Sequence, residues 1–436
     1  MRYPEAKIKE AILHPDPNIR DRVTSYFAKS FSPDPSIMPV VIKAVETYGR
    51  QNDAYRLIGK SRDLRQTEDT IAWVIDELNN PQSNQIDNYI YNLSMVLAKA
   101  DPAVLLSRES DILEARHFPP ALHASFAERL RMLSWDMATC WQKLEELCEE
   151  GKDKEDASEI NMGYANRIVE ALARYGHECE EKVHSLLSQK VANYSTDPMK
   201  WLEPLAVRLA GEAQLESTIP FLVAKLLEDD VLLEEECLRA LTQIGTPAVL
   251  QAVAEAYPDA PHNFRLYASG PLEYIHSDLA VQKCLLLLPQ EEEWDLKSNL
   301  ARSLLSHFPQ EGIEAVRQML LGRELDIDDR HLRNYLVATC TIMGEQFPEY
   351  NEWLAEEKAE KEENSRRLKE LKGDPLGTLA YAFGKGADKK TDNPQIKPHV
   401  PLKPPPSKPT GKQKIGRIGL CPCKSGKKFK TCCMRK

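Results

Sequence analysis

Amphipathic helices that recur in pairs constrain the fold of this chain more than any other feature of its sequence. Residues 231–244 show the pattern most clearly, since their apolar side chains recur at helical spacing while glutamates occupy the other faces. The apolar stripe consists of Leu233, Cys237, Leu241 and Ile244. A helix of this kind buries one face against neighbouring elements and exposes the other.

Further helices are expected around this one, grouped into hairpins. The expected pairs are 219–227 with 231–244, 247–256 with 263–276, 279–288 with 294–308, and 312–321 with 328–343. They recur about every 27 to 36 residues, which is typical of an α-solenoid. One hairpin cannot bury its apolar face alone, so neighbours stack into a continuous core. No region alternates apolar and polar residues as a strand does. We therefore predict an all-α solenoid over residues 1–346.

Turns near the N-terminus suggest the kind of repeat. The segment His14–Arg20 resembles the turn inside HEAT repeats, where an aspartate and an arginine flank the start of the second helix. The resemblance implies that Asp16 caps this helix and that Arg20 pairs with an acidic group of the adjacent repeat. Residues 32–36 contain a second turn with the same Pro-Asp-Pro sequence. After Asp230, in contrast, no arginine occupies the equivalent position. TPR-like or unclassified helical hairpins therefore remain alternatives.

Beyond the solenoid the composition changes twice. Residues 347–383 are expected to form a polar capping helix, at about 348–372, and then a short amphipathic segment. Residues 384–413 are dominated by Gly, Lys, Asp and Pro, so we expect a flexible, basic and Pro-rich linker that does not fold alone. Residues 414–436 contain a separate cysteine module.

Charge divides along the same boundary. The chain has a net charge of −10, but residues 384–436 hold 15 Lys and Arg against 2 Asp and Glu, a net of +13. This leaves −23 on residues 1–383. The acidic body should repel nucleic acid, and the basic tail should attract polyanions or acidic protein faces. The alternative is that the tail folds back onto its own body.

The ten cysteines fall into two groups. Six are scattered singly and are expected to behave as small buried hydrophobic residues rather than nucleophiles. These six are Cys140, Cys148, Cys179, Cys237, Cys284 and Cys340. The other four have the spacing C-x-C-x8-C-C and are Cys421, Cys423, Cys432 and Cys433.

The four clustered cysteines predict one structural zinc ion. Cys421 and Cys423 point to the same side of an extended segment, and Cys432 and Cys433 converge if they lie in a turn. Four thiolates complete a tetrahedral Zn²⁺ site with no open position, so the metal should be structural. The surrounding lysines lower the thiol pKa values and favour metal binding. Two disulfides or free thiols are the alternatives.

The terminal segment resembles the SEC-C motif, named for the C-terminus of the preprotein translocase ATPase SecA. The matching positions are Gly416, Arg417, Cys421, Pro422, Cys423, Ser425, Gly426, Lys427, Lys428, Lys430, Cys432 and Cys433. Ile418, Lys424 and Phe429 depart from the usual Asn, Gly and Tyr. The resemblance implies a bacterial source and a detachable interaction element that contacts the chaperone SecB or ribosomes. No G-x-x-x-x-G-K-[ST] loop accompanies it, so the chain does not resemble the SecA motor.

These features favour a non-enzymatic adaptor. The solenoid would bind one protein partner, and the basic zinc module would bind a second, acidic partner. The residues expected to contact that partner are Arg417, Lys424, Lys427, Lys428, Phe429 and Lys430. A ribosome- or RNA-associated factor using the same tail is the first alternative.

An enzyme of the lyase or glycosylase type is the second alternative, although no catalytic residue is predicted. Four polar or aromatic residues were considered as pocket-lining side chains: His117, His123, Trp135 and Asp136. We also expect a cytoplasmic protein, because no stretch approaches the roughly 18 apolar residues of a membrane helix. The N-terminus lacks the apolar core of a secretory signal.

Overall fold

A computed structural model describes residues 2–50, 54–83, 86–189, 191–192, 196–228, 231–321 and 327–370. Within these ranges the chain is helical and holds no strand, apart from an isolated antiparallel bridge between Arg2 and Pro309. Met1–Asn364 form one compact unit. The described part of the second unit, Ser365–Lys436, is the end of the last helix.

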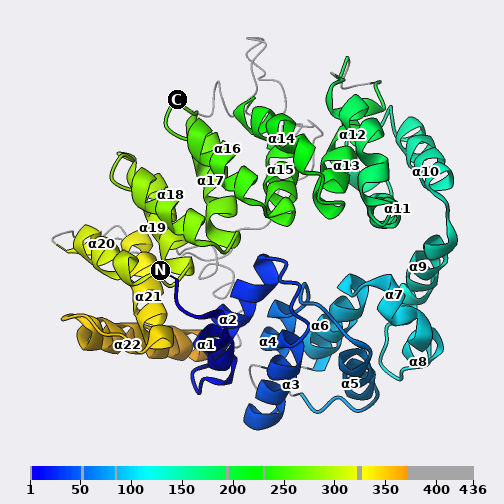
Figure 1. Cartoon of the computed structure of the whole chain (residues 1–436). Coiled ribbons are helices and arrows are strands. Elements are labelled where there is room, and N and C mark those ends of the chain that lie inside the picture. Colours follow the sequence, from blue (N-terminus) through cyan, green and yellow to red (C-terminus); the bar gives the residue numbers. More distant parts are fainter. Residues whose placement is uncertain are drawn as a thin grey trace, which may run out of the picture. The chain divides into compact units, whose positions relative to one another are not determined.

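The helices follow one another with short connections (Figure 1). The α-helices are α1 (Glu5–Glu10), α2 (Pro17–Lys29), α3 (Ile37–Tyr48), α4 (Ala54–Lys60), α5 (Glu68–Asn79), α6 (Ile86–Lys99), α7 (Pro102–Leu105), α8 (Glu109–Leu113), α9 (Pro120–Arg131), α10 (Met137–Glu150), α11 (Met162–Ala173), α12 (Glu180–Leu187), α13 (Met199–Glu212), α14 (Ile219–Leu227), α15 (Val231–Ile244), α16 (Pro247–Ala256), α17 (His262–Tyr274), α18 (Asp278–Leu287), α19 (Trp294–Ser306), α20 (Gln310–Leu320), α21 (Ile327–Met343) and α22 (Tyr350–Glu370). The 3-10 helices are η1 (Ala11–Leu13), η2 (Leu106–Arg108), η3 (Met132–Ser134), η4 (Ala157–Glu159), η5 (Gly176–Cys179) and η6 (Glu216–Thr218).

The predicted helical hairpins are confirmed. Helices α14 to α21 begin and end within two residues of the expected bounds, and α14, α15 and α16 match them at both ends. The apolar stripe of α15 is buried, with Leu233 and Ile244 at 3% and 4% exposure and Cys237 and Leu241 at 0%. The spacing of apolar residues therefore identified the buried face correctly.

Alternate helices pack side by side in two rows. Helices α11, α13, α15, α17, α19 and α21 form one row, in which each helix contacts the next, and Figure 1 shows its later members side by side. Helices α14, α16 and α18 form the second row and also contact the first. One hydrophobic core runs between the rows and continues through the N-terminal helices. This arrangement is that of an all-α solenoid.

The turn that resembles a HEAT repeat folds partly as expected. Asp16 caps α2, because its carboxylate accepts a hydrogen bond of 2.8 Å from the backbone N–H of Asn18. The expectation for Arg20 was wrong. Its guanidinium donates to the carbonyls of His14 and Pro15, both at 2.8 Å, and so fastens its own turn. These two carbonyls accept no hydrogen bond within a helix, so they are available as acceptors for the Arg20 guanidinium.

Arg–Glu pairs instead connect successive repeats elsewhere in the array. The nitrogen–oxygen distances are 2.7 Å for Arg50–Glu77, 2.7 Å for Arg129–Glu170, 2.8 Å for Arg265–Glu291 and 2.7 Å for Arg317–Glu349. The two residues of each pair lie 26 to 41 positions apart in the chain. Because the Glu291 side chain is only 1% exposed, loss of its partner would leave a buried charge uncompensated.

The first helices of the array also pack against its last ones. The N–H of Tyr3 donates to the carbonyl of Phe308 at 3.1 Å. The guanidinium of Arg2 donates to the carbonyl of His276 at 2.9 Å and to the hydroxyl of Tyr26 at 2.6 Å. The rings of Tyr26 and His276 stack with their centroids 3.7 Å apart. This junction between α2 and helices α17, α19 and α21 is called the seam below.

The six scattered cysteines are free and buried, as expected for small hydrophobic residues. Burial raises the pKa of the Cys284 thiol to about 12 and that of Cys179 to about 11. A thiol with so high a pKa holds almost no thiolate at neutral pH, so the structure supports their inert role.

Candidate functional site

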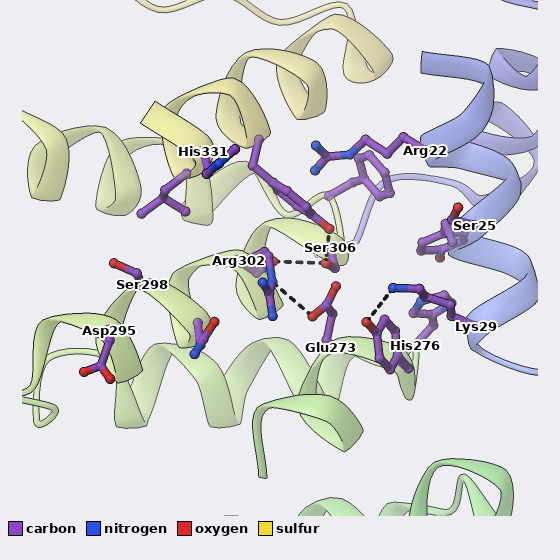
Figure 2. A pocket seen from close by; sticks show the side chains of 16 residues that line it. Arg22, Ser25, Lys29, Glu273, His276, Asp295, Ser298, Arg302, Ser306 and His331 are labelled. Atoms are coloured by element: carbon purple, nitrogen blue, oxygen red, sulfur yellow. Dashed lines mark hydrogen bonds and ion pairs between the residues drawn. The ribbon is translucent and has the colours of Figure 1, made fainter. Parts of the chain in front are cut away.

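A cavity of about 770 Å³ opens at the seam. Helix α2 forms one wall, and α17, α19 and α21 form the others. Its lining residues are Arg22, Ser25, Tyr26, Lys29, Glu273, Tyr274, His276, Asp295, Ser298, Asn299, Arg302, Ser306, Phe308, His331, Leu332 and Tyr335. We call this cavity the seam pocket. Figure 2 shows Arg22 and Lys29 reaching from α2 toward Arg302, Glu273 and Ser306 on the facing helices.

Arg22 is held firmly in this pocket. Its guanidinium carbon lies 3.2 Å from the centroid of the Tyr335 ring, and its Nη2 donates to the hydroxyl of Thr339 at 3.0 Å. The Tyr335 hydroxyl is in turn 2.7 Å from the hydroxyl of Ser306. Burial lowers the pKa of Arg22 below its usual value, although the group stays charged at neutral pH. The pocket therefore contains a preorganised cation.

The opposite wall holds a compensated charge pair. Arg302 Nε lies 3.2 Å from a carboxylate oxygen of Glu273, whose side chain is 8% exposed. Lys29 donates to the hydroxyl of Tyr274 at 3.0 Å. Burial is the main cause that holds the pKa of His276 well below its usual value. Electrostatic interaction with His307 and Arg2 lowers this pKa further. His276 is therefore neutral at physiological pH.

A second cavity, of about 420 Å³, lies among α6, α9, α11, α13 and α15. Its cations are largely paired: Arg129 with Glu170, Arg167 with Glu128 at 2.8 Å, and Arg208 with Glu236 at 3.1 Å. Burial raises the pKa of the Glu212 carboxyl to about 7 in this cavity. Arg239 also lines this cavity, and its guanidinium carbon lies 5.5 Å from the centroid of the Phe31 ring.

Two small clusters bring together residue types that occur in metal sites and in catalytic triads. His262 lies 2.8 Å from Glu293 and 3.6 Å from Asp295, and all three side chains are exposed. Ser217 donates to Glu180 and lies 2.8 Å from Nε2 of His184. In a catalytic triad the histidine bridges the other two groups, whereas here the serine does.

Of the four residues that the enzyme alternative places in a pocket, three make contacts that stabilise the helical fold. Asp136 caps α10 by accepting from the N–H of Thr139 at 2.7 Å, and the carbonyl of Trp135 accepts from Tyr175. The ring of His123 stacks on Phe118 with centroids 5.5 Å apart. None of these, nor His117, lines either cavity.

The predicted metal ligands and the predicted partner-binding residues lie outside the described residues, as do the linker and the amphipathic segment. The metal ligands are Cys421, Cys423, Cys432 and Cys433. The partner-binding residues are Arg417, Lys424, Lys427, Lys428, Phe429 and Lys430.

Residues 420–435 match the SEC-C motif. The match confirms the resemblance and its place at the C-terminal end of the chain. The SEC-C motif is associated with metal binding in general, and the match spans all four clustered cysteines.

No curated protein matches the chain significantly. Among solved structures, the crystal structure of an engineered protein aligns with 78% of this chain and 99% of its own at 14% identity and a TM-score of 0.27. Similarity at this level carries no argument about function. Among the helices that the structure describes, none has both the length and the apolar character needed to cross a membrane.

Sequence reasoning missed the seam pocket altogether. Its lining comes from helices whose sequence positions differ by roughly 250 to 300 residues. The one local signal was Arg22, which lies one helical turn from each of the buried residues Ile19 and Tyr26 on α2. A charged residue there needs a partner or a cavity.

Proposed function

We propose that this protein is a non-enzymatic adaptor whose helical body binds one protein partner and whose SEC-C module binds a second, acidic partner. The observation that carries the proposal is the SEC-C match at residues 420–435, attached to an all-helical array. An α-solenoid offers an extended surface for protein recognition. A motif of some twenty residues at the end of such an array suits a protein-binding scaffold.

The metal of this module would be one structural Zn²⁺. Four thiols within 13 residues form a donor set that suits tetrahedral zinc, and they leave no position for a substrate. The remaining six cysteines are buried singly in the body and do not compete for the ion. A segment this short buries little apolar surface, so the metal would supply most of its folding free energy.

The charge of the module supports an acidic partner. Residues 384–436 carry a net charge of +13, with basic residues between and beside the cysteines. An acidic protein face, such as that of a SecB-like chaperone or of a ribosomal protein, fits this charge. The contact residues we propose are Arg417, Lys424, Lys427, Lys428, Phe429 and Lys430.

RNA is the competing partner for the same basic module. Phosphate binding by lysines would release counterions, so the affinity for RNA would fall steeply as salt rises. A protein contact with a packed interface would depend on salt less strongly. The acidic body argues against an RNA-binding surface outside the tail, because residues 1–383 carry a net charge of −23.

A pull-down with nuclease-treated extract tests the proposal. The baits are the full chain, the full chain with Cys432→Ser and Cys433→Ser, and the full chain with Lys427→Gln and Lys428→Gln. We expect an acidic protein that survives nuclease and 0.5 M salt with the first bait and is lost with the other two. If ribosomal RNA and its proteins are captured and disappear with salt or nuclease, the RNA alternative replaces the proposal. If all three baits recover the same proteins, the SEC-C module is not the contact.

A further inference from the structure

Arg22 in the seam pocket lacks an anionic partner. No carboxylate oxygen of the described residues lies within ion-pair distance of its guanidinium, whose nearest polar contact is the hydroxyl of Thr339. Coulomb attraction from Glu273 and Glu357 reaches it only at longer range. Lys29 likewise contacts a neutral hydroxyl, that of Tyr274, instead of a carboxylate. Two cationic side chains therefore line the pocket without a direct ion pair to any carboxylate of the described residues.

Several further polar groups in the pocket are free to bind. The hydroxyl oxygen of Ser298 is buried and has no hydrogen-bond partner, a situation that costs free energy unless a ligand or water satisfies it. The side chains of Ser25, Asn299 and His331 also line the pocket, and none of them makes a side-chain hydrogen bond with the described residues. The pocket thus presents hydroxyl, amide and imidazole groups in addition to the two cations.

The acidic groups of the pocket are already engaged. Glu273 forms the ion pair with Arg302, and Asp295 lies 3.6 Å from the imidazole of His262. Three cationic side chains, those of Arg22, Lys29 and Arg302, therefore line the pocket against two carboxylates. Aromatic rings from Tyr26, Tyr335 and Phe308 complete the walls and provide flat apolar surface.

We propose that the seam pocket binds a small anionic molecule through its phosphate or carboxylate group, with Arg22 and Lys29 as the principal contacts. A guanidinium offers several N–H donors and binds either group with charge-assisted hydrogen bonds. The cavity of about 770 Å³ falls in the size range of small-molecule sites. A ligand there would join α2 to α17, α19 and α21, and would thereby stabilise the seam.

This inference is independent of the adaptor proposal, because it concerns the body and not the SEC-C module. Titration calorimetry on the full chain tests it, with inorganic phosphate, acetate and adenosine monophosphate as separate probes. We expect saturable binding of at least one probe at one site per chain, together with a rise in melting temperature. Phosphate and nucleotide binding without acetate binding would identify a phosphate site, and acetate binding would extend it to carboxylates.

Three sets of variants distinguish the pocket from the basic tail. Arg22→Gln should weaken binding about tenfold or more, and Lys29→Gln, on an exposed side chain that leaves the fold intact, should weaken it several-fold. Arg108→Gln removes an exposed charge outside the pocket and should leave affinity unchanged. Lys427→Gln with Lys428→Gln should also leave it unchanged. Absence of saturable binding by all three probes, or its loss in the tail variant but not in Arg22→Gln and Lys29→Gln, would overturn the proposal.

Discussion

The guanidinium carbon of Arg22 on α2 lies 3.2 Å from the centroid of the Tyr335 ring on α21. This contact joins the second helix of the chain to the last but one, beside the hydrogen bonds that Arg2 makes to Tyr26 and His276. An α-solenoid whose ends meet gains long-range contacts that a simple stack of repeats lacks. The stability of the body should therefore depend on the seam as well as on neighbouring hairpins.

The first prediction concerns this pair. A double-mutant cycle with Arg22→Met and Tyr335→Leu should give a coupling free energy of about 0.5 to 2 kcal/mol, because the guanidinium is partly desolvated on the ring face. Urea unfolding followed by circular dichroism measures it. Tyr335→Phe keeps the ring and loses only the hydroxyl contact with Ser306, so it should preserve most of the coupling. Additive effects of the two substitutions would show that the stacking does not contribute.

The second prediction uses two helical glycines. A Cβ at Gly211 on α13 would lie 2.5 Å from the backbone Cα of Ala240 on α15, so Gly211→Ala should force these helices apart. We expect a loss of about 1 to 3 kcal/mol. Gly163→Ala on α11 is the matched control, since its Cβ would meet nothing closer than 3.6 Å. That change should stabilise the protein by up to about 1 kcal/mol through helix propensity. Equal effects in thermal unfolding would contradict the close approach of α13 and α15.

How much of the fold and of the candidate site the sequence predicts depends on how far apart the contacting residues lie in the chain. The apolar stripe of α15 and the turn at Asp16 are local patterns, and both folded as predicted. The SEC-C motif is also local, because its four cysteines lie within 13 residues. Arg20 was assigned to the wrong partner because two unsatisfied carbonyls of its own turn were nearer than any acid of the next repeat.

The seam, in contrast, consists of contacts between residues far apart in the sequence. Nothing in residues 2–29 indicates that they meet α17, α19 and α21, since the contacting residues belong to distant repeats and follow no periodic pattern. The inter-repeat pairs, such as Arg265 with Glu291, have a sequence signal only once the repeat boundaries are known. The seam pocket therefore becomes visible only when the helices are placed in space.

The third prediction is a pH dependence that originates in the seam. His307 is fully buried, and its Nε2 lies 2.7 Å from the carbonyl of Leu272. Burial lowers the pKa of His307 from 6.5 to about 4, although the hydrogen bond to the Leu272 carbonyl opposes the shift. The nearby charge of Arg2 lowers the pKa further, and that of Asp278 raises it. Burial lowers the pKa of the adjacent His276 as well. Between pH 6.5 and about 4 the unfolded chain therefore binds protons that the folded chain does not.

The contribution of these two histidines to the free energy of unfolding should thus be constant above pH 6.5. The free energy of unfolding should fall as pH decreases from 6.5 toward 4. His307→Gln retains an N–H donor for Leu272 but cannot titrate, so the fall should become shallower. The measurement is the urea midpoint across this pH range, and His177→Gln, on a side chain that is 79% exposed, serves as the control. A wild-type slope in the His307→Gln protein would show that His307 does not contribute.

The last prediction separates the SEC-C module from the body. Replacing Cys432 and Cys433 with Ser removes two of the four proposed thiolate ligands, so the proposed zinc should be absent from this variant, as measured by elemental analysis after gel filtration. Because the body has its own continuous core, its helical circular dichroism signal and melting temperature should remain unchanged. Cys284→Ser is the reciprocal control: this residue is 0% exposed, so the body should lose about 1 kcal/mol or more while the zinc content stays at one per chain. A large fall in melting temperature for the Cys432 and Cys433 variant would instead show that the module is part of the folded body, and the proposed adaptor would then present one combined surface rather than two.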